Sequence, residues 1–221
     1  MRTIQVLIST LLAVALISCG GSKQKSSVTT DSTKSSVSQP TANAEPVSGS
    51  VKKYPIKSGI VTFDMDMMSI KQKTILYFDD YGVKEAEEKY DGDAVKEMDL
   101  CDGKTRYTIM YAKKTAYSSG DCYRGTAYKF DWNEISKADK QYKVKKLANV
   151  NIAGKDCESY SMNSGDYPTV FAGWQNVLLY QETKTKYGTI IKKAVKVEGD
   201  ASIPAEKFKI PEGFTVKASG M

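Results

Sequence analysis

Alternation of apolar and polar residues limits the fold of this chain more than any other feature. Val61, Phe63, Met65 and Met67 are separated by single polar residues. Successive side chains of a strand point to opposite faces of a sheet, so this spacing predicts a strand with one buried face. Further β-rich segments are predicted at 74–78, 83–90, 94–101, 104–111, 115–117, 145–152, 157–162, 169–174, 177–183 and 189–198.

Short turn signals separate these segments and predict antiparallel neighbours. Asp91-Gly92-Asp93 and Asp102-Gly103 are examples, because connections this short join strands that run in opposite directions. The pattern changes at residues 131–142, where an Asp or Asn cap precedes a lysine-rich helix signal, and residues 203–208 predict one short helical turn. We therefore predict an α+β fold over residues 54–221: a curved antiparallel sheet, or incomplete β-barrel, packed around one or few helices.

The amino terminus has the layout of a bacterial secretory signal. Arg2 supplies the positive charge, and residues 6–17 form an apolar run that is shorter than the ~20 residues of a spanning helix. Leu16-Ile17-Ser18-Cys19 resembles the lipobox of bacterial lipoproteins. This resemblance implies that residues 1–18 are removed and that Cys19 carries acyl chains such as palmitate. The alternative is an ordinary signal peptide with an incidental cysteine.

Residues 19–53 are predicted to connect the lipidated cysteine to the folded domain. The segment is rich in Ser, Thr, Lys and Gln and lacks an apolar period. Such a composition buries too little surface to offset the entropy of ordering, which predicts a flexible tether. Its typical reach is about 30 Å, so the domain is expected to work close to a membrane.

The absence of histidine excludes several kinds of site. The 221 residues contain none, which rules out Ser-His-Asp and Cys-His triads and zinc sites with imidazole ligands. The formal net charge of +6 is spread along the chain rather than gathered in a basic stripe, which argues against nucleic-acid binding. We predict no enzymatic activity, no cofactor and no metal site.

Three cysteines remain if Cys19 carries lipid, and an odd number leaves at least one unpaired. Cys101 and Cys122 flank a predicted hairpin and are the favoured disulfide pair, while Cys157 is the third. An exported compartment permits disulfides. The other two pairings, and three reduced cysteines that pack as small apolar residues, also agree with the count.

A set of apolar and aromatic residues is spaced to line one side of the predicted sheet. Flexible methionines suit variable acyl chains, and aromatic rings combine an apolar body with a polar end. The candidate ligand cavity consists of Phe63, Met65, Met67, Tyr107, Ile109, Tyr111, Phe171 and Trp174. The alternative is that these residues form only the core of the domain.

The C-terminal half carries a family resemblance. Residues 150–160, 174–179 and 201–211, in that order, resemble bacterial exported domains related to the outer-membrane lipoprotein carrier and receptor, the LolA/LolB-like proteins. Residues 102–107 and 113–117 resemble the middle hairpin of that group. The resemblance implies an incomplete barrel around helices, with an apolar concavity for acyl chains. Gly20 without a following acidic cluster implies the outer membrane, facing the periplasm.

These observations predict a lipid-anchored protein of the cell envelope that binds a lipid, a lipoprotein acyl chain or another amphiphile. The membrane is its expected partner through the acyl chains at Cys19, and the sequence names no protein partner. Two alternatives remain open. One is a structural or envelope-interaction module without a ligand, and the other is a glycan-binding surface lipoprotein.

Overall fold

A computed structural model describes residues 52–68, 70–122, 142–164 and 167–218, all within the part of the chain that spans Glu45–Met221. The strands are β1 (Gly59–Met67), β2 (Ile70–Asp79), β3 (Lys84–Asp91), β4 (Ala94–Cys101), β5 (Thr105–Met110), β6 (Thr115–Asp121), β7 (Lys145–Ile152), β8 (Lys155–Ser164), β9 (Tyr167–Trp174), β10 (Val177–Thr185), β11 (Gly188–Gly199) and β12 (Thr215–Ala218). Three short 3-10 turns are η1 (Asp80–Gly82), η2 (Tyr111–Lys113) and η4 (Ala205–Phe208).

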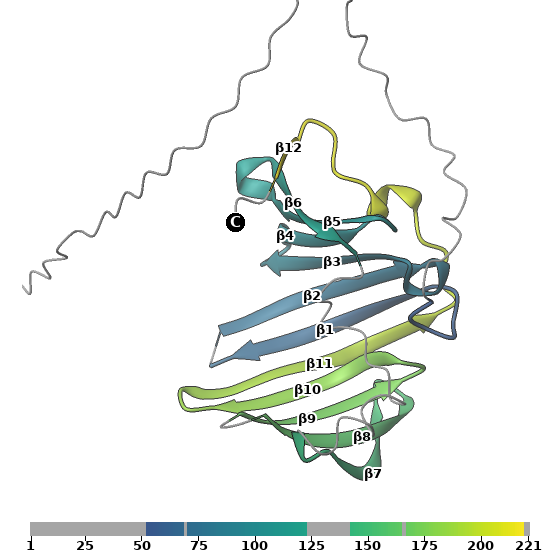
Figure 1. Ribbon diagram of the computed structural model, residues 1–221, viewed down its shortest axis with the longest axis vertical. Coiled ribbons are helices and arrows are strands. Elements are labelled where there is room, and N and C mark those ends of the chain that lie inside the picture. Colours follow the sequence, from purple (N-terminus) through teal and green to yellow (C-terminus); the bar gives the residue numbers. More distant parts are fainter. Residues whose placement is uncertain (1–51, 69, 123–141, 165–166, 219–221) are drawn as a thin grey trace, which may run out of the picture. The chain divides into compact units, whose positions relative to one another are not determined.

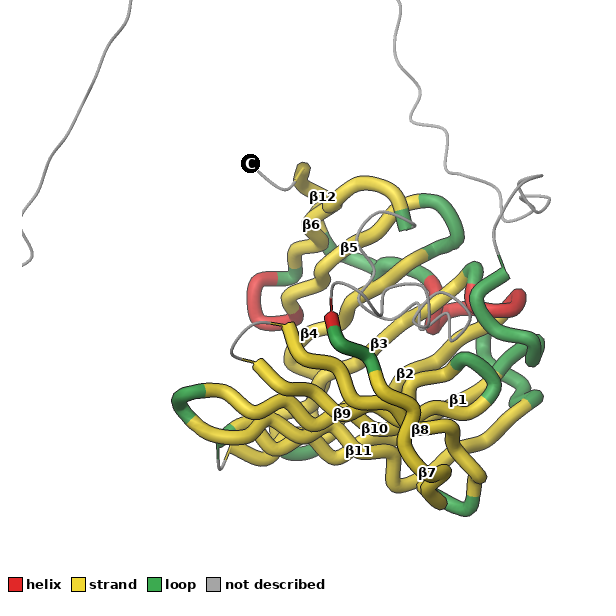
Figure 2. Tube along the Cα trace, turned by 60° about the horizontal axis from the view of Figure 1, so that its bottom comes forward, coloured by secondary structure: helices red, strands yellow, loops and turns green. Residues whose placement is uncertain are grey.

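The strands form one sheet in the order β12-β6-β5-β4-β3-β2-β1-β11-β10-β9-β8-β7 (Figure 1). Neighbouring strands are antiparallel, except that β12 runs parallel to β6. The sheet is curved and open, and it does not close into a barrel (Figure 2). The predicted curved antiparallel sheet is therefore confirmed, and β1 pairs with β11 at its centre although the two strands are far apart in the sequence.

The helical predictions have different outcomes. The segment 131–142 lies outside the described residues, apart from Tyr142, which has helical backbone. The short turn at 203–208 is present as η4. Strand β12 is not among the predicted segments, because its four exposed residues carry no pattern of burial.

The two faces of the sheet carry separate apolar clusters. Register places Phe63 and Phe78 on one face, which we call the Phe63 face, and Tyr77 and Ala86 on the other, the Tyr77 face. The Phe63 cluster contains the buried residues Tyr54, Val61, Phe63, Phe78, Ile152, Cys157, Ala172, Val177, Leu179 and Ala194. The Tyr77 cluster contains Tyr77, Ala86, Met98, Leu100, Ile109, Ala116 and Phe208. The sheet is thus apolar on both sides.

The C-terminal segment, residues 203–214, covers the Tyr77 cluster. Phe208 is buried in it, and Ile203, Ile210 and Phe214 pack against it. The Phe214 ring meets Tyr111 edge to face, with ring centroids 5.4 Å apart. This segment therefore supplies apolar cover that the sheet lacks on that face.

The segment before β1 packs on the Phe63 face near the turn between β2 and β3. The backbone N–H groups of Lys53 and Tyr54 both donate to the carbonyl of Tyr81, at 2.8 and 3.0 Å. Gly82 has φ of +81°, and a Cβ there would lie 2.6 Å from the Tyr54 ring. Glycine is required at this turn for its left-handed backbone and for space.

No helix among the described residues is long and apolar enough to cross a membrane.

Candidate functional site

The structure divides the predicted cavity residues between the two faces of the sheet. Phe63 is buried in the Phe63 cluster, and Met65 and Met67 lie half-buried further along the same face of β1. Tyr107 and Ile109 belong to the Tyr77 cluster, against which Tyr111 also packs. The eight residues therefore do not form one continuous lining, because register determines which face each strand presents.

The two remaining members of the predicted cavity lie on β9. Phe171 is buried, and Trp174 packs half-buried against the Phe63 cluster. Lys155 places its Nζ 4.5 Å from the Trp174 ring centroid. These contacts are those of core residues, which is the alternative that the sequence left open.

A row of charged residues occupies the Phe63 face of β3 and β4. Lys192 donates to buried Glu87 at 2.5 Å. Lys89 bonds both Glu97 and Asp99, at 2.5 and 2.8 Å. A buried carboxylate needs a charged or hydrogen-bonding partner, and here the partners are lysines. This part of the face is therefore charged, where the resemblance had implied an apolar concavity.

An open groove lies at the end of the sheet near the β1–β2 turn, and we call it the β1–β3 groove. Its volume is about 530 Å³. It is lined by Asp64, Met65, Asp66, Lys71, Gln72, Lys73, Tyr90, Asp91, Gly92, Ile191 and Lys193. Met65 is the single member of the predicted cavity that lines it.

Tyr90 is the aromatic member of this groove, and its position is fixed by two charged neighbours. Its hydroxyl donates to Glu88 at 2.6 Å, and Lys73 places its Nζ 4.3 Å from the ring centroid. Burial, followed by the hydrogen bond to Glu88, raises the pKa of Tyr90. The hydroxyl thus keeps its proton at neutral pH and remains a hydrogen-bond donor.

The groove combines opposite charges with apolar surface. Three lysines and three aspartates line it, so its formal charge is balanced. Ile191, the Tyr90 ring and the methylene stems of the lysines supply the apolar part. No group of three His, Cys, Asp or Glu side chains among the described residues could hold a metal ion. The chemistry of the groove is therefore that of binding a polar or zwitterionic group beside an apolar one.

A second depression, of about 310 Å³, lies over β7 to β10. Polar and charged side chains such as Lys145, Asn163, Glu182 and Lys184 line most of it. Because its volume is smaller than that of the β1–β3 groove, it is the weaker candidate site.

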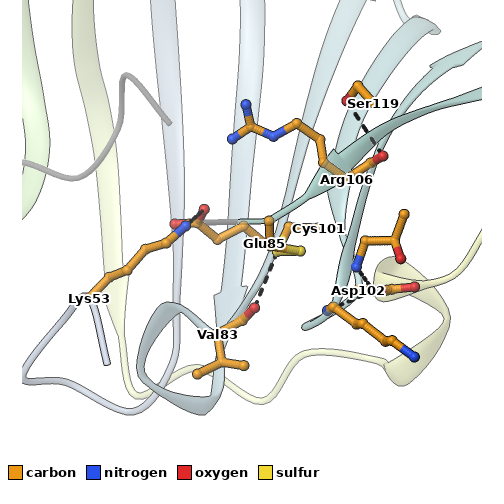
Figure 3. Close-up of a disulfide and its surroundings, with 10 residues drawn as sticks. Lys53, Val83, Glu85, Cys101, Asp102, Arg106 and Ser119 are labelled. Atoms are coloured by element: carbon orange, nitrogen blue, oxygen red, sulfur yellow. Dashed lines mark hydrogen bonds and ion pairs between the residues drawn. A yellow bond between two sulfur atoms is a disulfide. The ribbon is translucent and has the colours of Figure 1, made fainter. Parts of the chain in front are cut away.

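Cys101 and Cys122 form a disulfide with Cα atoms 5.4 Å apart, between the end of β4 and the residue after β6 (Figure 3). This is the pair that the sequence favours. Cys157 is a free, buried cysteine, and burial raises the pKa of its thiol. Cys19 lies outside the described residues.

Most of the groove residues were not predicted from the sequence. In the alternating pattern of β1, Asp64 and Asp66 occupy the polar positions, which predicts that they face solvent, and Tyr90 ends the predicted segment 83–90. The sequence indicates the groove only in part. The Asp91-Gly92-Asp93 turn predicts that Tyr90 lies at the end of a strand, but it does not indicate which residues lie near it. The approach of Ile191 and Lys193 depends on the pairing of β1 with β11, which no local pattern specifies.

No protein-family model and no curated protein matches the chain. Among solved structures, an uncharacterized conserved protein from Thermus thermophilus is similar, with a TM-score of 0.55 at 11% identity over 76% of this chain and 94% of that protein. MucB is similar with a TM-score of 0.53 at 12% identity, over 75% of this chain and 61% of MucB. The chain thus spans about three fifths of MucB.

At these identities the likeness shows a shared fold and nothing finer. A domain assigned to outer membrane lipoprotein sorting in Vibrio parahaemolyticus is also matched, over 69% of this chain at 11% identity. Its TM-score of 0.34 is too low to support an argument. The LolA/LolB-like resemblance therefore contributes to the functional proposal through the sequence alone.

Proposed function

We propose that this protein is a lipid-anchored, non-catalytic protein of the cell envelope that binds an amphiphile in the β1–β3 groove. The groove carries the proposal because its volume of about 530 Å³ lies within the range of small-molecule sites. It also places the apolar side chain of Ile191 on the same face as Asp66 and Lys71, with which it shares a register position. The chain has no histidine to serve as a catalytic base.

The charge balance of the groove favours a zwitterionic head group over a simple anion. Lys71, Lys73 and Lys193 can meet a phosphate, while Asp64 and Asp91 can meet an ammonium group. A lysophosphatidylethanolamine has both groups and one acyl chain. We therefore expect the protein to prefer this lipid over lysophosphatidylglycerol of the same chain length.

Ligand preference can be measured by native mass spectrometry of the full chain with Cys19→Ala, which removes the proposed acylation site. We expect the zwitterionic lipid to bind. Reversing two charges, in Lys71→Glu/Lys193→Glu, should weaken this binding about tenfold, since hydrogen bonds to charged groups contribute about 1.5–3 kcal/mol. Lys209→Glu/Lys217→Glu is the matched control, because both lysines are exposed and outside the two depressions.

The control variant should bind the zwitterionic lipid as the parent does. Equal loss in both double variants would mean that general charge, not the groove, attracts the lipid. Absence of binding by the parent chain would overturn the proposed function. Equal affinity for the two lysolipids would contradict the proposed preference for a zwitterionic head group.

The anchor is proposed from the sequence around Cys19, and its location from Gly20: the outer membrane, facing the periplasm. We expect the wild-type chain in its bacterial host to fractionate with membranes and the Cys19→Ala variant to move largely to the soluble fraction. The variant should keep the thermal unfolding transition of the domain, since Cys19 precedes the predicted tether. Unchanged fractionation of Cys19→Ala would contradict acylation as the main anchor.

A second candidate function is an envelope-interaction module without a bound ligand. The observation that favours it is the burial of Phe63 within a packed cluster, where the sequence had placed the wall of a cavity. A glycan-binding surface has less support, because Trp174 packs against the core and is covered by Lys155. The lysolipid experiment separates the first two candidates, since the module would bind neither lipid.

A further inference from the structure

Two neighbouring turns expose large apolar side chains. Met68 and Ile70 lie at the β1–β2 turn, with 49% and 65% of their surface exposed. Tyr187 lies at the β10–β11 turn and is 74% exposed. Large apolar residues at such exposure are costly in water, and a contiguous group of them is typical of an interaction surface.

The two turns lie at the same end of the sheet and contact each other. Met67 pairs with Ile190 across β1 and β11, so both turns begin at the same level. A Cβ built on Gly188 would lie 3.1 Å from Met68 Cγ. Figure 1 shows the β1–β2 and β10–β11 turns side by side at the left edge of the sheet. Met68, Ile70 and Tyr187 thus belong to one surface.

The same turns carry positive charge. Residues 67–71 and 184–188 contain three lysines, Lys71, Lys184 and Lys186, and no acidic residue. Lys186 places its Nζ 4.8 Å from the Tyr187 ring centroid. The next turn along the sheet, between β3 and β4, carries Asp91 and Asp93 and limits the basic region on that side. We call Met68, Ile70, Lys71, Lys184, Lys186 and Tyr187 the tip patch.

We propose that the tip patch docks on an anionic lipid surface. Apolar and aromatic side chains next to lysines match the layers of a bilayer, because the apolar groups enter the acyl boundary while the ammonium groups meet lipid phosphates. Positive charge favours an anionic surface over a zwitterionic one. The complementarity of charge and of apolar surface therefore points to a membrane rather than to a peptide.

The tip patch is far from the place where the predicted tether joins the domain. Lys53 and Tyr54 are bonded to Tyr81, beyond the opposite end of β2. Ten residues of strand span about 33 Å, so docking through the tip patch adds a contact remote from the tether. The tip patch shares only Lys71 with the β1–β3 groove. Ile70, Lys184, Lys186 and Tyr187 do not line the groove, so variants at these residues test the tip patch separately.

Vesicle sedimentation tests this proposal with the full chain carrying Cys19→Ala. Vesicles of phosphatidylglycerol and phosphatidylethanolamine should bind the protein, and vesicles of phosphatidylcholine alone should bind it at least about tenfold more weakly. High salt should reduce the binding, since it screens exposed charges. No sedimentation with the anionic vesicles would overturn the proposal.

Two pairs of variants locate the contact. Ile70→Ser/Tyr187→Ser and Lys184→Gln/Lys186→Gln should each weaken vesicle binding about tenfold. The matched controls are Val195→Ser/Val216→Ser, at positions 50% and 54% exposed, and Lys209→Gln/Lys217→Gln, at exposed lysines outside the tip patch and both depressions. If the tip variants bind as strongly as their controls, the tip patch is not the contact.

A further measurement covers the case in which a serine variant fails to fold. The Tyr187→Trp variant keeps an aromatic ring at the tip patch, and its added fluorescence should shift to shorter wavelength with anionic vesicles. An unshifted spectrum would contradict insertion of this residue. All these variants should keep the parent's lysolipid binding, so failure of vesicle docking is distinguishable from failure of the groove.

Discussion

Replacing Lys53 by methionine should lower the free energy of unfolding by about 3–5 kcal/mol, the usual cost of breaking a buried pair on one side. The Lys53 side chain is 2% exposed, and its Nζ donates to Glu85 at 2.5 Å. Tyr54 donates to the other oxygen of the same carboxylate. In the variant, the buried Glu85 carboxylate keeps its hydrogen bond from Tyr54 but loses its ion pair with Lys53. Urea unfolding at neutral pH measures the change.

Two further variants separate this explanation from a general loss of packing. Lys53→Met/Glu85→Leu removes both charges and should cost less than Lys53→Met alone, because no carboxylate is left unpaired. Lys146→Met breaks an exposed pair with Glu158 on β7 and β8 and should leave unfolding unchanged. A double variant less stable than the single one would show that the pair itself, not the stranded charge, provides the stability.

The sheet could be predicted because its strands repeat a local pattern. Phe63 and Met65 alternate with polar residues, and turns such as Asp91-Gly92-Asp93 set the limits of the hairpins. The same local information could not pair β1 with β11, which brings residues 59–67 against 190–199. Pairing between segments far apart in the sequence depends on the packing of the whole sheet, so the β1–β11 pair cannot be predicted from either segment alone.

The eight residues predicted to line one cavity do not share a face of the sheet. Alternation shows which residues within one strand point the same way, but it does not show which face of the sheet they point to. Phe63 and Ile109 each have correct alternation, yet register places them on opposite faces. The charged groups of the β1–β3 groove were visible only as solvent-facing residues. A site formed by the polar sides of several strands gives no local signal, since exposed charges are common on any sheet.

The sheet is apolar on both faces, so each face needs cover from outside the sheet. On the Tyr77 face, residues 203–214 provide that cover, and Lys207 bonds Glu88 at 2.6 Å while its Nζ lies 4.5 Å from the Tyr77 ring centroid. Glu88 is itself buried. The segment therefore satisfies a buried carboxylate as well as covering apolar surface, which makes its attachment a determinant of the stability of β2 to β6.

Phe208→Ala should lower the free energy of unfolding by about 3–5 kcal/mol, because it leaves a cavity in the Tyr77 cluster. Phe208 is 7% exposed and packs at the centre of the C-terminal segment. Phe214→Ala is the matched control: this ring is half-buried and contacts Tyr111 at the edge of the cluster, so its loss should cost about 1–2 kcal/mol. Thermal and urea unfolding measure both. Equal costs for the two variants would mean that the segment is held along its whole length rather than by the single buried ring.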